Sequence, residues 1–126
     1  MCLLERAEAT LSGIERDGSP KGFAVQADCA IPEESAPKIV AETVARFGDK
    51  IDIIVNNAAN GSDQVLADVD RPVFDTTFPT NVLFPLLLIK ESNRYLSKGA
   101  HIVNISSSGS RAGKIGRSVP SSCQCR

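Results

Sequence analysis

The sequence predicts an α/β fold with a doubly wound parallel sheet of about three strands and flanking helices. Three observations carry this prediction. Segments of helical and of strand character alternate along the chain. Residues 51–55, IDIIV, are apolar on both faces, as a central parallel strand requires. Polar residues follow each of the three predicted strands, and ligand sites in such sheets lie beyond the carboxyl ends of the strands.

The first half of the chain predicts a helix, a strand and a second helix. Apolar residues at helical spacing predict a helix over residues 3–14, which Asp17-Gly18 ends. Residues 22–28, GFAVQAD, alternate and are rich in β-forming residues, so they predict a strand. Residues 31–48 predict a helix with acidic residues at its start, an irregular first turn at Pro37 and an end at Gly48.

The second half continues the alternation. After the strand at 51–55, residues 68–96 keep a helical period despite Pro79 and Pro85, and residues 100–106, AHIVNIS, predict a further strand. The order α-β-α-β-α-β indicates parallel strands joined by crossover helices. We therefore expect one domain over residues 1–113. Residues 114–126 are rich in Ser, Gly and Arg, so they predict an irregular, disordered tail.

Composition narrows the function classes. The chain has 126 residues, 42% of them hydrophobic and 23% charged, with a net charge of −1, so no basic excess predicts a nucleic-acid partner. No apolar run approaches the roughly 20 residues that span a bilayer, so no membrane partner is predicted. Without a signal-like N-terminus, four irregularly spaced cysteines favour a cytoplasmic chain with reduced thiols. Cys123 and Cys125 lack a second ligand pair, so no metal site is predicted.

Two local patterns carry chemistry of their own. Asn56 and Asn57 stand at the end of a buried strand, where an amide can both donate to and accept from unpaired backbone groups. Asn81 lies four residues before Pro85, which has no N–H, so the carbonyl of Asn81 loses its helical partner. A free carbonyl in a kinked helix can hold an ordered water.

At its strand ends the sequence resembles the classical short-chain dehydrogenase/reductase family, in its ketoreductase branch. The matching pieces are QAD, DIIVNNAA, TNV and HIVNISS, in family order, over about residues 5–113. The resemblance implies a partial Rossmann-type fold, NADP or NAD as cofactor, and hydride transfer between that cofactor and a small-molecule carbonyl or alcohol substrate. It also implies homo- or hetero-oligomers formed through the long helix, residues 73–96.

The resemblance assigns cofactor-binding roles to five residues. Asp28 would accept from the adenine amino group, while the next backbone N–H meets a ring nitrogen. Asn56 and Asn57 would stabilise the sheet and line the ribose, and the small Ala58 would let the cofactor lie against the backbone. A Lys or Arg near Lys90 lies around the cofactor in related enzymes. The simpler alternatives are a turn aspartate, an Asn-rich turn and a solvated lysine.

Two residues would serve catalysis by the same resemblance. Asn81 would hold a water in a proton relay, and Ser107 would hydrogen-bond the substrate carbonyl, with Ser108 as the alternative if the register slips. The competing interpretations are a kinked packing helix and a flexible serine loop. His101 is expected at the surface, and Tyr95, the only tyrosine, is expected to serve packing.

Two family signatures do not occur in the sequence. The first is the glycine-rich turn TGxxxGxG, so we expect the first strand, first helix and second strand of the family to be missing. The second is YxxxK, which supplies the acid/base tyrosine, so the chain is expected to be inactive alone. The changed composition after Gly113 suggests a shifted reading frame or a retained intron.

The same features leave a second hypothesis open. The chain keeps the long helix, so it can be a non-catalytic interaction fragment that pairs with a full-length subunit. A third interpretation, a stand-alone nucleotide- or RNA-binding α/β module, is disfavoured by the near-neutral charge and the lack of aromatic stacking platforms. An incomplete sheet would expose strand edges, so marginal stability is expected.

Overall fold

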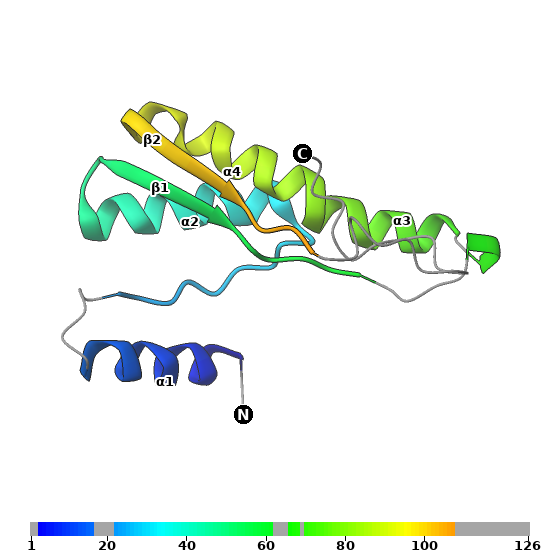
Figure 1. Cartoon of the computed structure of the whole chain (residues 1–126), viewed down its shortest axis with the longest axis horizontal. Helices are drawn as coiled ribbons and strands as arrows, with labels where there is room; N and C mark the ends of the chain where they lie inside the picture. Colours follow the sequence, from blue (N-terminus) through cyan, green and yellow to red (C-terminus); the bar gives the residue numbers. More distant parts are fainter. Residues whose placement is uncertain (1–2, 17–21, 62–65, 69, 108–126) are drawn as a thin grey trace.

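The computed structural model describes residues 3–16, 22–61, 66–68 and 70–107 (Figure 1). The predicted tail, Ser108, and Cys123 and Cys125 lie outside the described residues. The elements in chain order are α1 (Leu3–Arg16), α2 (Pro32–Phe47), β1 (Ile51–Asn56), the 3-10 turn η1 (Leu66–Asp68), α3 (Arg71–Phe78), the π-helical turn η2 (Pro79–Leu83), α4 (Phe84–Ser92), the 3-10 turn η3 (Asn93–Tyr95) and β2 (Leu96–Asn104).

Strands β1 and β2 form a parallel pair, as the alternation of elements predicts. Val55 pairs with Val103 and Asn56 with Asn104, and the N–H of Ile105 donates to the carbonyl of Asn56 at 2.9 Å. The register shifts between Ile51 and Ile53 of β1. The facing part of β2 contains Gly99, whose φ of +85° is a conformation that glycine adopts without steric cost. Strand β2 begins at Leu96, four residues earlier than the sequence predicts.

The strand predicted at residues 22–28 is wrong for the described structure. The segment runs extended beside the sheet (Figure 1), but no strand ladder joins it to β1 or β2. Side chains of α2 hold it instead: the Nζ of Lys38 donates to the carbonyl of Gln26, and the Oγ of Ser35 donates to the carbonyl of Asp28, both at 2.6 Å. Alternating residues encode an extended backbone, whereas a strand also needs a neighbour that pairs its N–H and C=O groups.

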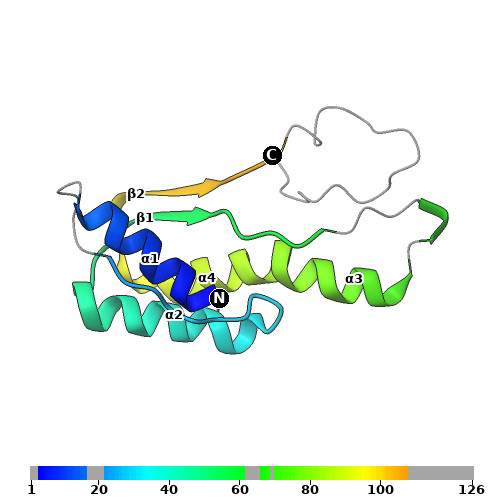
Figure 2. The same ribbon diagram turned by 90° about the horizontal axis from the view of Figure 1, so that it is seen from below.

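Helices α2 and α4 pack against each other and lie on one side of the sheet (Figure 2). The buried apolar residues among the described ones are Ala36, Val40, Ile54 and Phe84. Alternation along β1 turns Ile53 and Val55 to the opposite face, where they are 60% and 56% exposed. The core of the described structure therefore lies between the helices and one face of the sheet.

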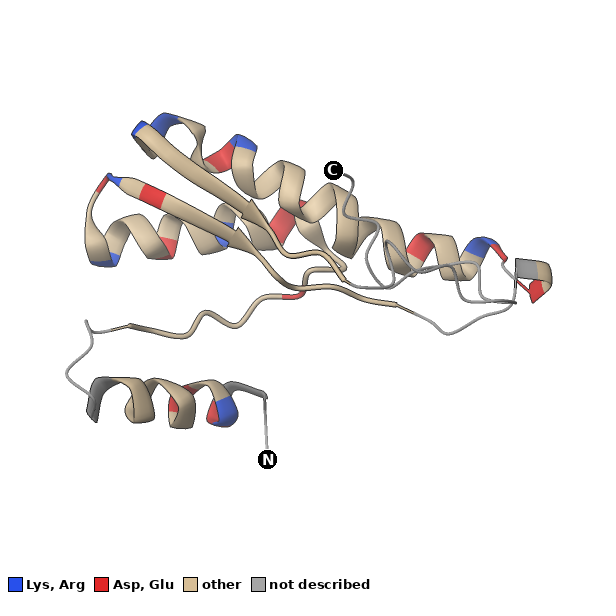
Figure 3. Ribbon diagram, viewed as in Figure 1, with Lys and Arg blue, Asp and Glu red and all other residues tan. Residues whose placement is uncertain are grey.

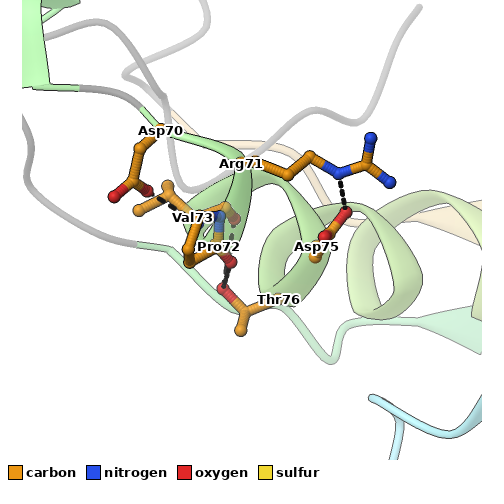
Figure 4. A network of polar contacts seen from close by, with 6 residues as sticks. All are labelled: Asp70, Arg71, Pro72, Val73, Asp75 and Thr76. Carbon is orange, nitrogen blue, oxygen red and sulfur yellow. Dashed lines mark hydrogen bonds and ion pairs between the residues drawn. The ribbon is translucent and has the colours of Figure 1, made fainter.

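The long helix predicted over residues 68–96 is present as a continuous helical stretch, Arg71–Tyr95. Asp70 caps its start, since its Oδ1 accepts from the N–H of Val73 at 3.1 Å, and the Nε of Arg71 pairs with Oδ1 of Asp75 at 2.6 Å (Figure 4). By length and hydropathy alone this stretch meets the criteria for a membrane span, but it packs on α2 and β1 as a layer helix does.

The break predicted near Asn81 is confirmed. Residues Pro79–Leu83 form a π-helical turn, in which the N–H of Phe84 donates to the carbonyl of Pro79 five residues back. Pro85 has no N–H to offer to the carbonyl of Asn81, so the ordinary i→i+4 pattern is interrupted here. The covalent structure of proline therefore determines where this helix departs from regular geometry.

Charged side chains of both signs are interspersed along the helices (Figure 3). The helix ends follow the usual preferences: α2 begins with Glu33 and Glu34 and closes with Arg46 in its last turn. Gly48 then ends α2 with a φ of +91°, and its N–H donates to the carbonyl of Val44 at 2.9 Å. The predicted end of this helix is thereby confirmed.

Candidate functional site

The three predicted site segments reach the same edge of the structure. Strands β1 and β2 are parallel, so Asn56, which ends β1, and Ser107, which follows β2, lie on the same side. The segment 22–28 runs in the same direction and delivers Asp28 toward that side, where α2 begins (Figure 1). In sheets of this class, ligands bind beyond this edge.

Asp28 forms a tight corner between the extended segment and α2. Its Oδ1 accepts from the N–H of Ala30 at 2.9 Å, and its backbone carbonyl accepts from the N–H of Ile31 at 3.0 Å. The turn role that the sequence left open is therefore real. It uses one carboxylate oxygen and leaves Oδ2 of this exposed residue for an amine donor.

Cys29 follows Asp28 in the chain, and the pKa of its thiol reflects the burial and charge at this corner. Partial burial raises the pKa of the Cys29 thiol, and the negative charge of Asp28 raises it further. The thiol is therefore predominantly protonated at neutral pH. A ligand that neutralised the charge of Asp28 would relieve the second of these effects.

Asn56 joins the carboxyl ends of the two strands. It is only 4% exposed, and its Nδ2 donates to Oδ1 of Asn104 at 2.8 Å. One asparagine of the pair Asn56-Asn57 was expected to hold neighbouring strands together, and Asn56 is the one that does so. Asn57 and Ala58 are exposed on the loop that follows β1. Sequence reasoning missed Asn104, although IIVN (residues 53–56) aligned with HIVN (residues 101–104) places both asparagines at strand ends.

Asn81 anchors that loop from the long helix. It is 4% exposed, its Oδ1 accepts from the N–H of Asn60 at 2.7 Å, and its Nδ2 donates to the carbonyl of Asn60 at 2.6 Å. Both polar atoms of the side chain are thus bonded to Asn60, and the backbone carbonyl of Asn81 finds no N–H at Pro85 four residues on. Asn60 was not identified from the sequence, because Asn81 binds its backbone N–H and C=O groups, which every residue except proline carries.

The structure brings Ser107 to the site edge but not Lys90. Ser107 is exposed three residues beyond the end of β2. Lys90 is exposed in α4 and its Nζ lies 3.6 Å from Oε1 of Glu91, so the described contacts make it a surface ion pair. Tyr95 precedes β2, and the guanidinium of Arg94 lies 4.6 Å from the centre of its ring, in agreement with a packing role.

Comparison with known proteins identifies the family. The sequence profile described as short chain dehydrogenase matches residues 3–123. The short-chain dehydrogenase/reductase FrzI of Cladobotryum sp is 34% identical over 114 residues, which cover 90% of this chain and 43% of that protein. L-xylulose reductase of Aspergillus niger is 36% identical over 110 residues, 75% of this chain and 37% of that protein. The chain spans less than half the length of these relatives.

Solved structures agree with the sequence comparison. A short-chain dehydrogenase of Burkholderia cenocepacia in complex with NADP is 31% identical, with a TM-score of 0.79 over 90% of this chain and 45% of that one. A short-chain dehydrogenase/reductase of Serratia marcescens is 27% identical, with a TM-score of 0.82 over 92% of this chain and 46% of that one. The predicted partial Rossmann-type fold is confirmed, and this chain belongs to the short-chain dehydrogenase/reductase family.

Proposed function

We propose that this chain is part of an NAD(P)-dependent oxidoreductase that transfers hydride between the cofactor and a small carbonyl or alcohol substrate. The observation that carries the proposal is the parallel pairing of β1 and β2, which places Asn57 and Ser107 after their carboxyl ends at one edge, while the segment 22–28 runs in the same direction beside them (Figure 1). A family member of similar structure is a complex with NADP, which supports NADP or NAD as the ligand of this edge.

The described residues fit an adenine nucleotide. Oδ2 of Asp28 can accept from the exocyclic amine, because the Asx turn uses only Oδ1. Ala58 is exposed and small, so a cofactor can lie against the loop that Asn81 holds in place. A bound nicotinamide would supply or accept the hydride. Ser107 would orient the substrate oxygen, and the backbone carbonyl of Asn81 would hold a water for proton transfer.

We further propose that residues 1–126 alone do not turn over substrate. The family's proton donor is a tyrosine, and Tyr95 is the only one in this sequence. Tyr95 precedes the nine residues of β2 and Ser107 follows them, so about 30 Å of extended strand separates the two residues. Tyr95 therefore cannot reach an oxygen bound at Ser107.

Two assays on one preparation test this function. NADPH fluorescence titrations should show weak binding, and NADPH oxidation with a panel of ketones should stay at the rate of a blank. Binding that Asp28→Asn weakens would support the cofactor site, with Asp75→Asn on the far helix as the control. Ketone-dependent turnover above the blank, from protein free of host reductases, would contradict the inactivity.

A second candidate function is pairing with a full-length subunit of the family. Four exposed apolar residues, Phe74, Phe78, Val82 and Leu86, recur every four positions along α3, η2 and α4. They form one face of the helix and line a groove of about 300 Å³. Co-expression of this chain with a full-length reductase of the family tests the idea. A co-eluting hetero-oligomer would support pairing, whereas separate elution would contradict it.

A further inference from the structure

Ser35 binds both backbone groups of Asp28. The N–H of Asp28 donates to Oγ of Ser35 at 3.1 Å, and the same Oγ donates to the carbonyl of Asp28 at 2.6 Å. A hydroxyl can donate and accept at once, so one side chain replaces the two bonds that a neighbouring strand would make. Ser35 is 5% exposed, so water does not compete for these bonds.

This contact matters because no strand ladder orients Asp28. The extended segment 22–28 lacks a paired strand among the described residues. Its hydrogen bonds to α2 are those of Ser35 at Asp28 and Lys38 at Gln26, and at its other end the ring of Phe23 contacts the side chains of Arg46 and Phe47. The hold by Lys38 is exposed, whereas the hold by Ser35 is buried. Ser35 is therefore the stronger determinant of where the backbone of Asp28 points.

The direction of the Asp28 carboxylate follows from that backbone. The Asx turn ties Oδ1 to the N–H of Ala30, so fixing the N–H and C=O of Asp28 also fixes where Oδ2 points. We propose that Ser35 is the positioning residue for adenine recognition by Asp28, and that it acts from helix α2 through a buried hydroxyl. This assignment rests on the proposed cofactor role of Asp28.

The preference for adenine over hypoxanthine distinguishes the two possible roles of Ser35, because loss of a serine that served only stability would not change it. Adenine presents an amine to the carboxylate of Asp28, whereas hypoxanthine presents a carbonyl oxygen at the same position. A correctly placed Oδ2 should therefore favour adenosine monophosphate over inosine monophosphate. Loss of the Ser35 hydroxyl should weaken the binding of adenosine monophosphate and leave the binding of inosine monophosphate unchanged.

The experiment measures dissociation constants of both nucleotides by NMR titration of the whole chain. Ser35→Ala should weaken adenosine monophosphate by about tenfold, the equivalent of one good hydrogen bond, and so collapse the preference over inosine monophosphate. Thr43→Ala is the matched control, because Thr43 lies in the same helix and its hydroxyl donates to the carbonyl of Ile39 at 2.7 Å, away from Asp28. It should leave both constants unchanged.

Two further comparisons separate positioning from folding. Ser35→Thr keeps the hydroxyl and should retain the preference for adenosine monophosphate. Ser35→Val has the shape of threonine without the hydroxyl, so it should behave as Ser35→Ala. In an Asp28→Asn background the effect of Ser35→Ala should vanish, since Ser35 acts through Asp28. Circular dichroism confirms that each variant is folded.

The contrary outcomes are distinct. Equal selectivity of the unaltered chain and Ser35→Ala would overturn the assignment of Ser35 and leave the cofactor role of Asp28 intact. No adenosine monophosphate binding by the unaltered chain at millimolar concentration would overturn the role of Asp28, and the assignment of Ser35 with it.

Discussion

The carboxamide of Asn81 holds both backbone groups of Asn60, with bonds of 2.7 Å to the N–H and 2.6 Å to the carbonyl. The contact joins the π-helical turn of the long helix to the loop after β1. Pro85 has no N–H for the backbone carbonyl of Asn81, so this residue anchors the loop at the point where the helix departs from regular geometry. Loop and helix are therefore expected to lose order together.

Asn81→Ala should lower the free energy of unfolding by about 1–3 kcal/mol, because it removes two hydrogen bonds to the backbone of Asn60, each of which contributes about 0.5–1.5 kcal/mol. Urea unfolding followed by circular dichroism measures the change. Asn60→Ala is the control, since it keeps the backbone groups that Asn81 binds and loses only a 3.3 Å bond to the carbonyl of Thr76. Equal losses in the two variants would contradict the anchoring role.

Asn56 and Asn104 should show a coupling energy of about 0.5–3 kcal/mol in a double-mutant cycle, because their amides bond to each other across the strand ends. The cycle comprises the two single alanine variants and the double variant, each unfolded in urea. Asn57→Ala, at an exposed loop position, should add independently to Asn104→Ala. A coupling energy of zero for Asn56 and Asn104 would refute the bond as a stabilising contact.

Alkylation of Cys29 should depend on the charge of Asp28. Burial and then Asp28 raise the pKa of the thiol, so its reactive thiolate forms only at pH values above the ordinary range of a free cysteine. Asp28→Asn removes the repulsion, so the pH profile of the rate should move to lower pH, although burial keeps it above that of a free cysteine. Iodoacetamide labelling with peptide mass mapping distinguishes Cys29 from the other three cysteines.

The control for this prediction is Asp75→Asn, which changes the same net charge on α3. It should leave the profile of Cys29 where it is. A profile that stays in place or moves to higher pH in Asp28→Asn would show that the charge of Asp28 does not act on the thiol.

Val82→Glu should abolish pairing through the long helix, because it places a charge in the middle of the apolar face formed by Phe74, Phe78, Val82 and Leu86. Co-elution with a co-expressed full-length family reductase measures pairing. Ile14→Glu is the matched control, since Ile14 is also an exposed apolar residue but lies on α1. Pairing that survives Val82→Glu would exclude this face as the interface.

Several elements could be predicted from the sequence because they depend on residues that are close together in the chain. Helical spacing predicted α1 and α2, and Gly48 marked the end of α2 because glycine accepts a positive φ there. The pattern IDIIV predicted β1. Pro85 predicted the break at Asn81, since a missing N–H is a covalent fact that no tertiary contact can restore.

Contacts between distant residues decided the rest. The alternation of residues 22–28 encodes an extended backbone, but α2 rather than a strand satisfies Asp28 and Gln26. Asn81 reaches the backbone of Asn60 twenty-one positions away, and Asn56 reaches Asn104 forty-eight positions away. Sequence periodicity reports what one segment prefers, whereas these bonds exist because packing of α2, α4 and the sheet brings separate segments within reach. The sequence by itself therefore determined the family and the order of the helices and of strands β1 and β2. The tertiary structure alone decided that residues 22–28 pair with no strand and which partners hold Asn56 and Asn81 in place.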